Sequence, residues 1–257
     1  MLDGRIFQRH HCRLTMERRT VRPSRSARVS RWLIIADSLA LPRPGVAYEH
    51  TWPKLLSDAV PQVDWINRGM RGATTERLST DGDGGGDCLE FYEPDGVILH
   101  LGICDAAPRL FSRKSLAMHL IYRLPFGINR KLSTWLERHG GRRIRNAWVS
   151  APQFERNLEE YLIRAQAHHA KVLALYILPV GSRMLMKNPL IARQIEIYNA
   201  IYDRLAERHC HLSIVRIFDS SNDIEEFFID GYHLNEAGGR RVAEVLTSRL
   251  AGTGLVG

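Results

Sequence analysis

The chain has 257 residues, of which 44% are hydrophobic and 25% are charged. This composition is typical of a globular protein and excludes collagen-like, disulfide-scaffold and wholly disordered chains. No run of about 18 apolar residues is present, so a membrane-spanning helix is excluded as well. The formal net charge of +8 is concentrated in residues 1–31, which contain nine Arg and two acidic residues. The remaining residues are nearly neutral, which argues against nucleic-acid binding by the folded part of the chain.

Residues 1–30 are predicted to be a basic, disordered tail, and residues 31–257 a single folded domain. The tail lacks the apolar stretch and the cleavage site of a secretory signal, although it is Arg-rich and acid-poor like a transit peptide. An upstream extension is the other interpretation, because Met16 offers an alternative start. The cysteines show no C-x-x-C spacing, so without a secretory signal we expect reduced thiols in a cytoplasmic protein. They are Cys12, Cys88, Cys104 and Cys210.

Continuous apolar runs predict strands that are buried on both faces, as in a parallel sheet. These runs are Trp32–Ala36, Val97–Leu101, Val172–Leu178 and Ser213–Phe218. A weaker run, Gln62–Asn67, is expected nearer an edge of the sheet.

Three helices are predicted from apolar stripes at helical spacing, over residues 154–165, 191–205 and 242–250. Ser150 and Gln153 offer a capping box for the first helix. Asn188 is the expected N-cap of the second, with Pro189 at its first position. The third is entered through Asn235. The alternation of strands and helices favours an α/β fold with right-handed crossovers.

A basic segment at residues 107–149 interrupts this alternation and contains two predicted short helices, at 114–123 and 129–138. It looks like an insertion at the carboxyl end of the third strand. Ligands bind at that end of open α/β sheets, so a role as a lid or specificity element is expected.

Two groups of metal-ligand residue types fail as metal sites. Asp81–Asp87 resembles a calcium loop, but Gly85 and Tyr92 stand where the EF-hand pattern requires an acid or amide and a Glu. We therefore predict a flexible loop there. His209–His211 has no second cluster, so a surface turn is the preferred interpretation. Neither a metal nor a cofactor is expected.

Four short blocks follow predicted strands or precede the last helix. Ser38 stands directly after the first strand, where backbone N–H groups can face a developing oxyanion. The others are Asn67–Thr74 with two glycines, Gly102–Asp105, and Asp230–Asn235. In the last block, Asp230 and His233 can meet, so the carboxylate can fix the imidazole tautomer. Taken singly, the serine is more often an N-cap and the glycines an ordinary turn.

The order of these blocks resembles the SGNH/GDSL hydrolase family over roughly residues 31–250. The resemblance implies a flavodoxin-like three-layer α/β/α sandwich with about five parallel strands, and cofactor-free hydrolysis of acetyl or acyl esters. It implies that Ser38 is the nucleophile, with His233 and Asp230 completing a catalytic triad, and that the N–H groups of Ser38 and Gly72 hold the oxyanion. Cys104 stands where the family has an oxyanion-donating Asn, and a thiol is a weak donor.

The preferred hypothesis is therefore a serine esterase acting on carboxylic or O-acyl esters, including O-acetyl groups of carbohydrates. Arg71, Arg109 and Arg113 are candidates for binding a polar or anionic part of the substrate, and a solvated surface role is the alternative for each. Because Cys104 stands in place of the family's Asn, a catalytically weak carbohydrate-binding or scaffolding protein remains an alternative function. An O-acyltransferase with the same triad also remains open.

Overall fold

The computed structural model describes residues 29–82, 85–108, 123, 127–128, 147–218 and 224–252. Within them, a five-stranded sheet has the order β2-β1-β3-β4-β5, and every neighbouring pair is parallel. The strands are β1 (Arg31–Ala36), β2 (Asp64–Asn67), β3 (Gly96–His100), β4 (Lys171–Leu175) and β5 (Leu212–Val215). The predicted flavodoxin-like topology is confirmed, and the weakest predicted strand lies at an edge.

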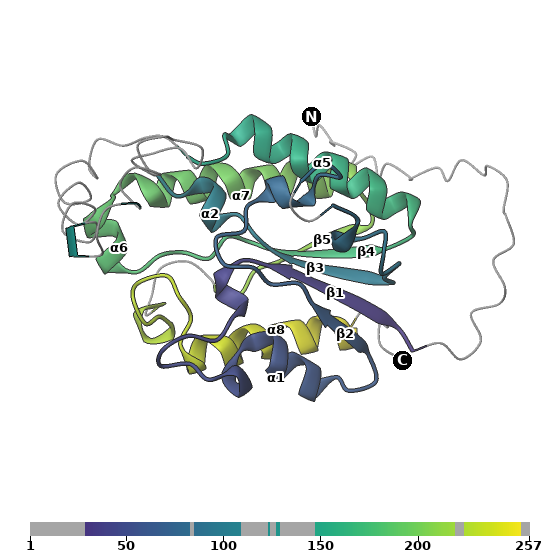
Figure 1. Ribbon diagram of the computed structural model, residues 1–257, viewed down its shortest axis with the longest axis horizontal. Coiled ribbons are helices and arrows are strands. Elements are labelled where there is room, and N and C mark those ends of the chain that lie inside the picture. Colours follow the sequence, from purple (N-terminus) through teal and green to yellow (C-terminus); the bar gives the residue numbers. More distant parts are fainter. Residues whose placement is uncertain are drawn as a thin grey trace, which may run out of the picture.

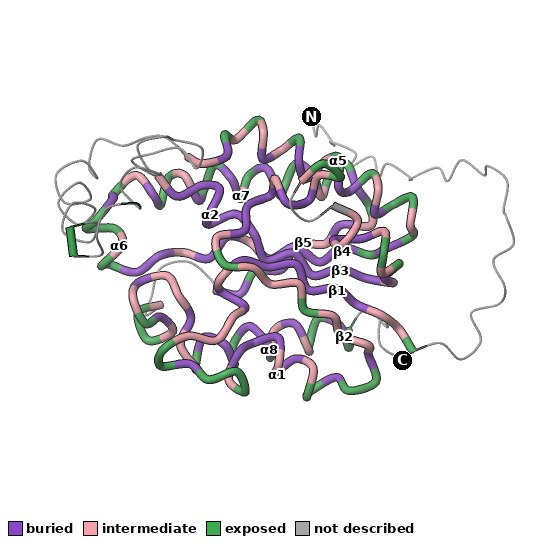
Figure 2. Tube along the Cα trace, viewed as in Figure 1, coloured by how far each residue is buried: buried purple, intermediate pink, exposed green. Residues whose placement is uncertain are grey.

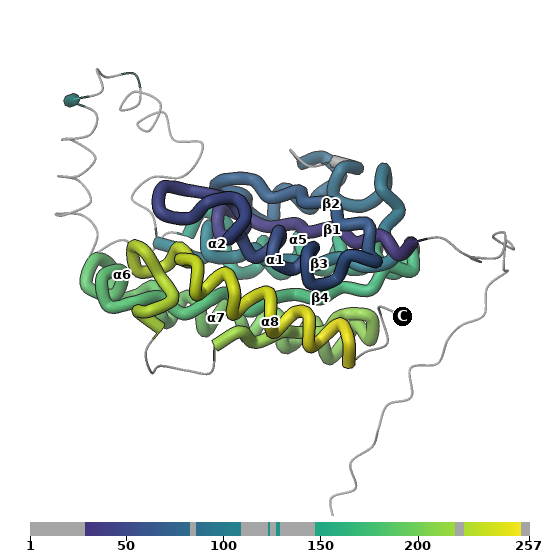
Figure 3. Tube along the Cα trace, turned by 90° about the horizontal axis from the view of Figure 1, so that it is seen from below, coloured from purple at the N-terminus to yellow at the C-terminus, as the bar shows by residue number. Residues whose placement is uncertain are grey.

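Helices cover both faces of the sheet and complete the three layers (Figure 1). One face carries α1 (Trp52–Ala59) and α8 (Glu236–Gly252), which lie side by side in Figure 3. The other carries α5 (Ala151–Ala167) and α7 (Leu190–Arg208). Two short helices, α2 (Ile103–Ala106) and α6 (Ser182–Lys187), lie at the carboxyl end of the sheet. The 3-10 turns are η1 (Ser38–Ala40), η2 (Tyr48–His50), η3 (Thr75–Leu78), η4 (Gly85–Cys88) and η6 (Ile224–Phe227).

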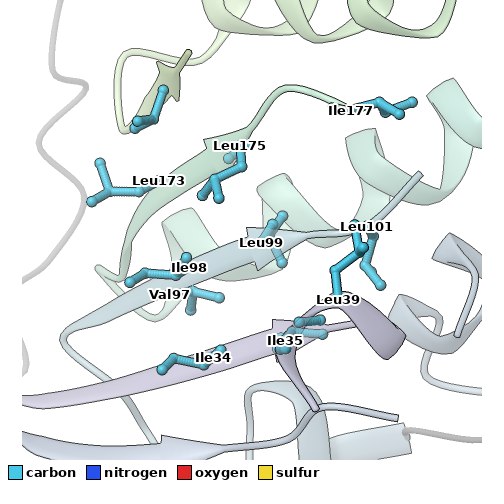
Figure 4. Close-up of a cluster of buried hydrophobic side chains, with 14 of the residues drawn as sticks. Ile34, Ile35, Leu39, Val97, Ile98, Leu99, Leu101, Leu173, Leu175 and Ile177 are labelled. Atoms are coloured by element: carbon cyan, nitrogen blue, oxygen red, sulfur yellow. The ribbon is translucent and has the colours of Figure 1, made fainter. Parts of the chain in front are cut away.

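The core lies between the sheet and these helices, because the central strands are apolar on both faces. All five residues of β3 are buried, as are five of the six residues of β1 (Figure 2). Figure 4 shows buried aliphatic side chains of β1, β3 and β4 as part of one cluster. Removing this much apolar surface from water is the main stabilising term of the fold.

The predicted helix starts are close to the observed ones, with two differences. Ser150 Oγ accepts the N–H of Gln153 at 3.4 Å, but the Gln153 side chain bonds to Asn157, so only half of the capping box forms. Helix α7 begins one residue later than expected, with Pro189 at the N-cap. The Asn188 side chain still accepts a helical N–H, that of Leu190, at 3.0 Å.

Strand β4 ends three residues before its apolar run ends. The N–H and C=O of Ile177 bond to the Asn199 side chain of α7 instead of to a neighbouring strand, at 2.8 and 3.1 Å. Strand β5 likewise ends at Val215, before the end of its predicted run. Helix α1 was not predicted, although Trp52, Leu55, Leu56 and Ala59 have helical spacing.

Residues from both segments that were rejected as metal sites form side-chain contacts within the fold. Asp87 pairs with Arg68 at 2.6 Å within a turn that includes η4, so this part of the predicted flexible loop is anchored. His209–His211 leads through a turn with an exposed Cys210 into β5, as predicted, but His209 itself is buried, and its Nε2 lies 2.8 Å from Glu159 Oε1. Of the helices predicted at 114–123 and 129–138, only Arg123 is described, and the remainder falls outside the described residues, as does the tail up to residue 28.

Candidate active site

Ser38 opens the turn that follows β1, at the carboxyl end of the sheet. Its neighbour Asp37 shapes this turn, because one carboxyl oxygen accepts the N–H of Leu39 at 2.8 Å. The N–H of Asp37 donates to the carbonyl of His100 at 3.2 Å, which ties the turn to the end of β3. The serine is therefore held by two central strands rather than by a free loop.

The loop before α8 brings His233 to this serine. His233 Nε2 lies 3.1 Å from Ser38 Oγ, and His233 Nδ1 lies 2.7 Å from Asp230 Oδ2. The other Asp230 oxygen accepts the backbone N–H groups of Tyr232 and His233 at 3.4 and 3.0 Å. Gly231 adopts a φ of +93°, which lets the chain turn tightly enough for Asp230 to reach the ring. The expected Asp–His contact therefore forms within one turn.

The electrostatics keep this imidazole neutral near neutral pH. Burial lowers the pKa of His233 below 6.5, the bond to Asp230 raises it, and the charge of Arg43 lowers it further. Burial raises the pKa of Asp230, but hydrogen bonds from His233 outweigh burial and hold it below 3.8. An ionised carboxylate can only accept, so the proton lies on Nδ1 and the Nε2 lone pair faces Ser38.

The backbone N–H groups of Ser38 and Gly72 are the candidate oxyanion donors at this site. Among the described residues, neither the N–H of Ser38 nor that of Gly72 donates a hydrogen bond. The turn that carries Gly72 is fastened to the end of β1, because the N–H of Met70 donates to the carbonyl of Ala36 at 3.0 Å. Gly72 has a φ of +69°, and no heavy atom lies within 4 Å of where a Cβ would stand. A ligand can therefore approach this backbone closely.

Cys104 lies in α2 and is buried, with 6% of its surface exposed. Its thiol hydrogen-bonds the carboxyl of Asp37, the residue before Ser38. Gly102 precedes it with a φ of +122°, and a Cβ there would stand 2.6 Å from the Ile177 side chain. Only glycine therefore fits at the point where the chain leaves β3 for α2.

Sequence reasoning missed a layer of buried titratable groups beneath the serine. Burial raises the pKa of both Asp37 and Asp105 to about 7. Asp105 accepts the N–H and the hydroxyl of Thr75 at 2.8 and 2.6 Å. Within the described part of the chain, each carboxyl keeps one oxygen without a partner. The signal for Asp37 was its position directly after β1, and the signal for Asp105 was its place in the short helix that follows β3.

Arginines border the site, and one of them was not predicted. Arg43 is half-buried and donates to the carbonyl of Ser38. Arg71 is exposed and donates to the carbonyl of Pro42. The signal for Arg43 was its place between two prolines, five residues after the serine. Arg109 and Arg113 lie outside the described residues.

Two negative observations complete the site's description. Across the residues that the structure covers, no group of three or more His, Cys, Asp or Glu side chains is arranged to hold a metal ion. In the same part of the chain, no helix has the length and hydrophobicity needed to cross a membrane.

Comparison with solved structures gives the same fold at low identity. A lipase/acylhydrolase from Enterococcus faecalis is 18% identical, with a TM-score of 0.58 over 87% of this chain and 96% of that one. The psychrotrophic esterase EstA from Pseudoalteromonas sp. is 17% identical, with a TM-score of 0.55 over 87% and 97%. A carbohydrate esterase family 2 enzyme from Corynascus thermopiles is also 17% identical, with a TM-score of 0.55 over 90% and 68%.

No curated protein matches the sequence. Residues 37–241 match the GDSL-like lipase/acylhydrolase family, which is most of the chain and includes Ser38, His233 and Asp230. The fold, the matched blocks and the solved relatives agree, so this chain belongs to the GDSL-like lipase/acylhydrolase family and is a hydrolase of ester bonds.

Proposed function

We propose that the chain is a serine esterase of carboxylic and O-acyl esters, with Ser38, His233 and Asp230 as its catalytic triad. The observation that carries this proposal is the unbroken series of hydrogen bonds from Ser38 Oγ through the imidazole to Asp230, at 3.1 and 2.7 Å. Nucleophile, base and orienting acid stand in the order that acyl transfer requires. The neutral His233 is ready to accept a proton.

The reaction runs in two steps. In the first, Ser38 Oγ attacks the ester carbonyl while His233 Nε2 takes its proton, and His233 then returns that proton to the departing alcohol. In the second, His233 takes a proton from a water molecule, which attacks the acyl-serine, and His233 then returns that proton to Ser38 Oγ as the carboxylic acid leaves. Asp230 keeps the proton on Nδ1 throughout and stabilises the imidazolium that forms in each step.

The tetrahedral intermediate needs donors for its oxyanion. The proposed donors are the N–H groups of Ser38 and Gly72, for which the described residues provide no acceptor. Cys104 occupies the position of a third donor, but its thiol is already engaged with Asp37 and is intrinsically weak. One oxyanion donor is worth about 10²–10³ in kcat, so this hole is weaker than one with an additional amide.

The proposed substrates are small-molecule or carbohydrate esters. The carbohydrate esterase from Corynascus thermopiles, which shares the fold, supports O-acyl groups on sugars as one class. The near-neutral charge of residues 32–257 supports a domain that does not bind nucleic acid. No cofactor takes part in the proposed reaction.

The test is hydrolysis of p-nitrophenyl acetate together with labelling by a fluorophosphonate. Ser38→Ala is expected to lower kcat by about 10⁴–10⁶, because triad members act as a unit. The probe should label wild type and Ser57→Ala, a control that removes a serine from the α1 surface, but not Ser38→Ala. Activity of Ser38→Ala within tenfold of wild type would refute the assignment. A labelled protein that transfers its acyl group to an added sugar faster than to water would be an acyltransferase instead.

A further inference from the structure

Two guanidinium groups are anchored on the same short loop beside the reacting serine. Arg43 donates to the carbonyl of Ser38, so its guanidinium lies against the backbone of the nucleophile itself. Arg71 comes from the turn after β2 and donates to the carbonyl of Pro42, the residue before Arg43. Segments from β1 and β2 therefore place two positive charges at one rim of the site.

The two charges act on each other and on the catalytic histidine. Burial lowers the pKa of Arg43, Asp230 raises it, and Arg71 lowers it. Both arginines also lower the pKa of His233. Each guanidinium is therefore near enough to the reacting groups for its charge to reach a bound substrate.

In the described part of the chain, neither guanidinium forms an ion pair with a carboxylate, since neither Arg43 nor Arg71 has one within 4.0 Å. Asp230, the acid that acts most strongly on Arg43, is committed to His233 at 2.7 Å. In contrast, the exposed Arg208 on α7 pairs with Glu155 and Glu159 at 3.1 and 2.7 Å. The two acids whose charges act on Arg43 are both engaged elsewhere, Asp230 by His233 and Asp37 by the N–H of Leu39.

We propose that Arg43 and Arg71 form an anion-binding subsite, which gives this esterase a preference for ester substrates that carry a carboxylate or a similar anionic group. The inference rests on the proposed function, because it takes Ser38 as the reacting atom. A guanidinium has five N–H donors in a planar fork that matches a carboxylate. The hydrogen bond from each arginine to a backbone carbonyl uses part of this fork and fixes its position, which leaves further donors for a ligand.

The anion can be on either half of the ester, so two matched substrate pairs test the proposal. For the acyl half, p-nitrophenyl hydrogen succinate is compared with its neutral methyl ester. For the alcohol half, 4-carboxyphenyl acetate is compared with 4-(methoxycarbonyl)phenyl acetate. In each pair, the ratio of kcat/KM between anionic and neutral ester cancels any general effect on catalysis. The pair with the larger ratio identifies the half that carries the anion.

In wild type we expect a ratio of about 10 or more in one pair, the effect of a charge-assisted hydrogen bond. Arg71→Ala and Arg43→Ala should each lower that ratio by about tenfold, and Arg71→Lys by less, because a charge remains. Arg208→Ala removes the same charge near the opposite edge of the sheet and should leave the ratio unchanged.

Equal rates for anionic and neutral esters in wild type would overturn the proposal, with the esterase function intact. So would variants that slow both members of a pair by the same factor, since Arg43 would then only hold the Ser38 backbone. If Arg43→Ala fails to fold, the exposed Arg71 decides the outcome alone. Hydrolysis of none of the four esters, together with no fluorophosphonate labelling of Ser38, would refute the proposed function and this inference with it.

Discussion

His100 ends β3, where its carbonyl accepts the N–H of Asp37 from the active-site turn, and it is a buried titratable group. It is 2% exposed, and its ring packs against Trp52 with the centroids 5.7 Å apart. Neither ring nitrogen has a hydrogen-bond partner within the described residues. Burial lowers the pKa of His100 from 6.5 to about 4. The folded chain therefore keeps this imidazole neutral at a pH where the unfolded chain protonates it.

This difference predicts a specific loss of stability in acid. As the pH falls below 6.5, His100 becomes protonated in the unfolded state, whereas in the folded state it becomes protonated only near pH 4. The contribution of His100 to the free energy of unfolding therefore decreases by about 2 kcal/mol between pH 7 and pH 5. His100→Leu removes this titration and keeps an apolar side chain of similar size. Relative to wild type, the variant should gain about 2 kcal/mol over the same range.

Urea unfolding followed by tryptophan fluorescence measures both proteins at pH 5, 6 and 7. Asp37 and Asp105 have raised pKa values, so they add stability as the pH falls through 7, in the opposite direction to His100. Comparing the variant with wild type cancels their effect and any constant change in packing. His168→Leu, at the solvent-accessible end of α5, is the control for removing an imidazole. Parallel pH curves for wild type and His100→Leu would refute the reasoning.

Three further predictions concern the site. The rate of ester hydrolysis should rise with pH through a single titration below pH 6.5. Burial lowers the pKa of His233, and only the neutral imidazole accepts the serine proton. A rate that is flat from about pH 5 to 8 would count against His233 as the base. Asp230→Asn should lower kcat by about 10⁴, because an amide facing Nδ1 favours the wrong tautomer, and unchanged kinetics would exclude that role. Asp105→Ala should lower the free energy of unfolding, measured in urea, by about 1–3 kcal/mol, because the buried N–H of Thr75 loses its acceptor. Asp105→Asn should lower it by less.

The layered fold was largely predictable because its strands are encoded as continuous apolar runs. The run at Val97–Leu101 can only be stabilised when both faces are covered, and this alone implies helices on both sides of a parallel sheet. Strand ends were less predictable. Beyond the end of β4, the backbone of Ile177 bonds to the Asn199 side chain, 22 residues further along the chain. No local sequence pattern at Ile177 predicts that this bond replaces one to a neighbouring strand.

The Ser38, Asp230 and His233 geometry could be anticipated because each residue stands at a predicted strand end or in a predicted turn, within a block that resembles the family. The contacts that surround these three residues could not be anticipated from the sequence. Arg43 reaches the serine carbonyl because of the path its loop takes, and Asp105 finds Thr75 across 30 residues. Such contacts depend on tertiary placement, whereas sequence spacing reports only local neighbours.

The hydrogen bond between Ser38 and His233 joins residues 195 positions apart. It links the turn after the first strand to the loop before the last helix, and the last helix, α8, packs beside α1. Contacts of such long range are costly to close and tend to form late in folding. During refolding, helical circular dichroism should therefore recover before esterase activity. Enzyme activity in this chain reports completion of the whole sandwich, not the formation of any one element.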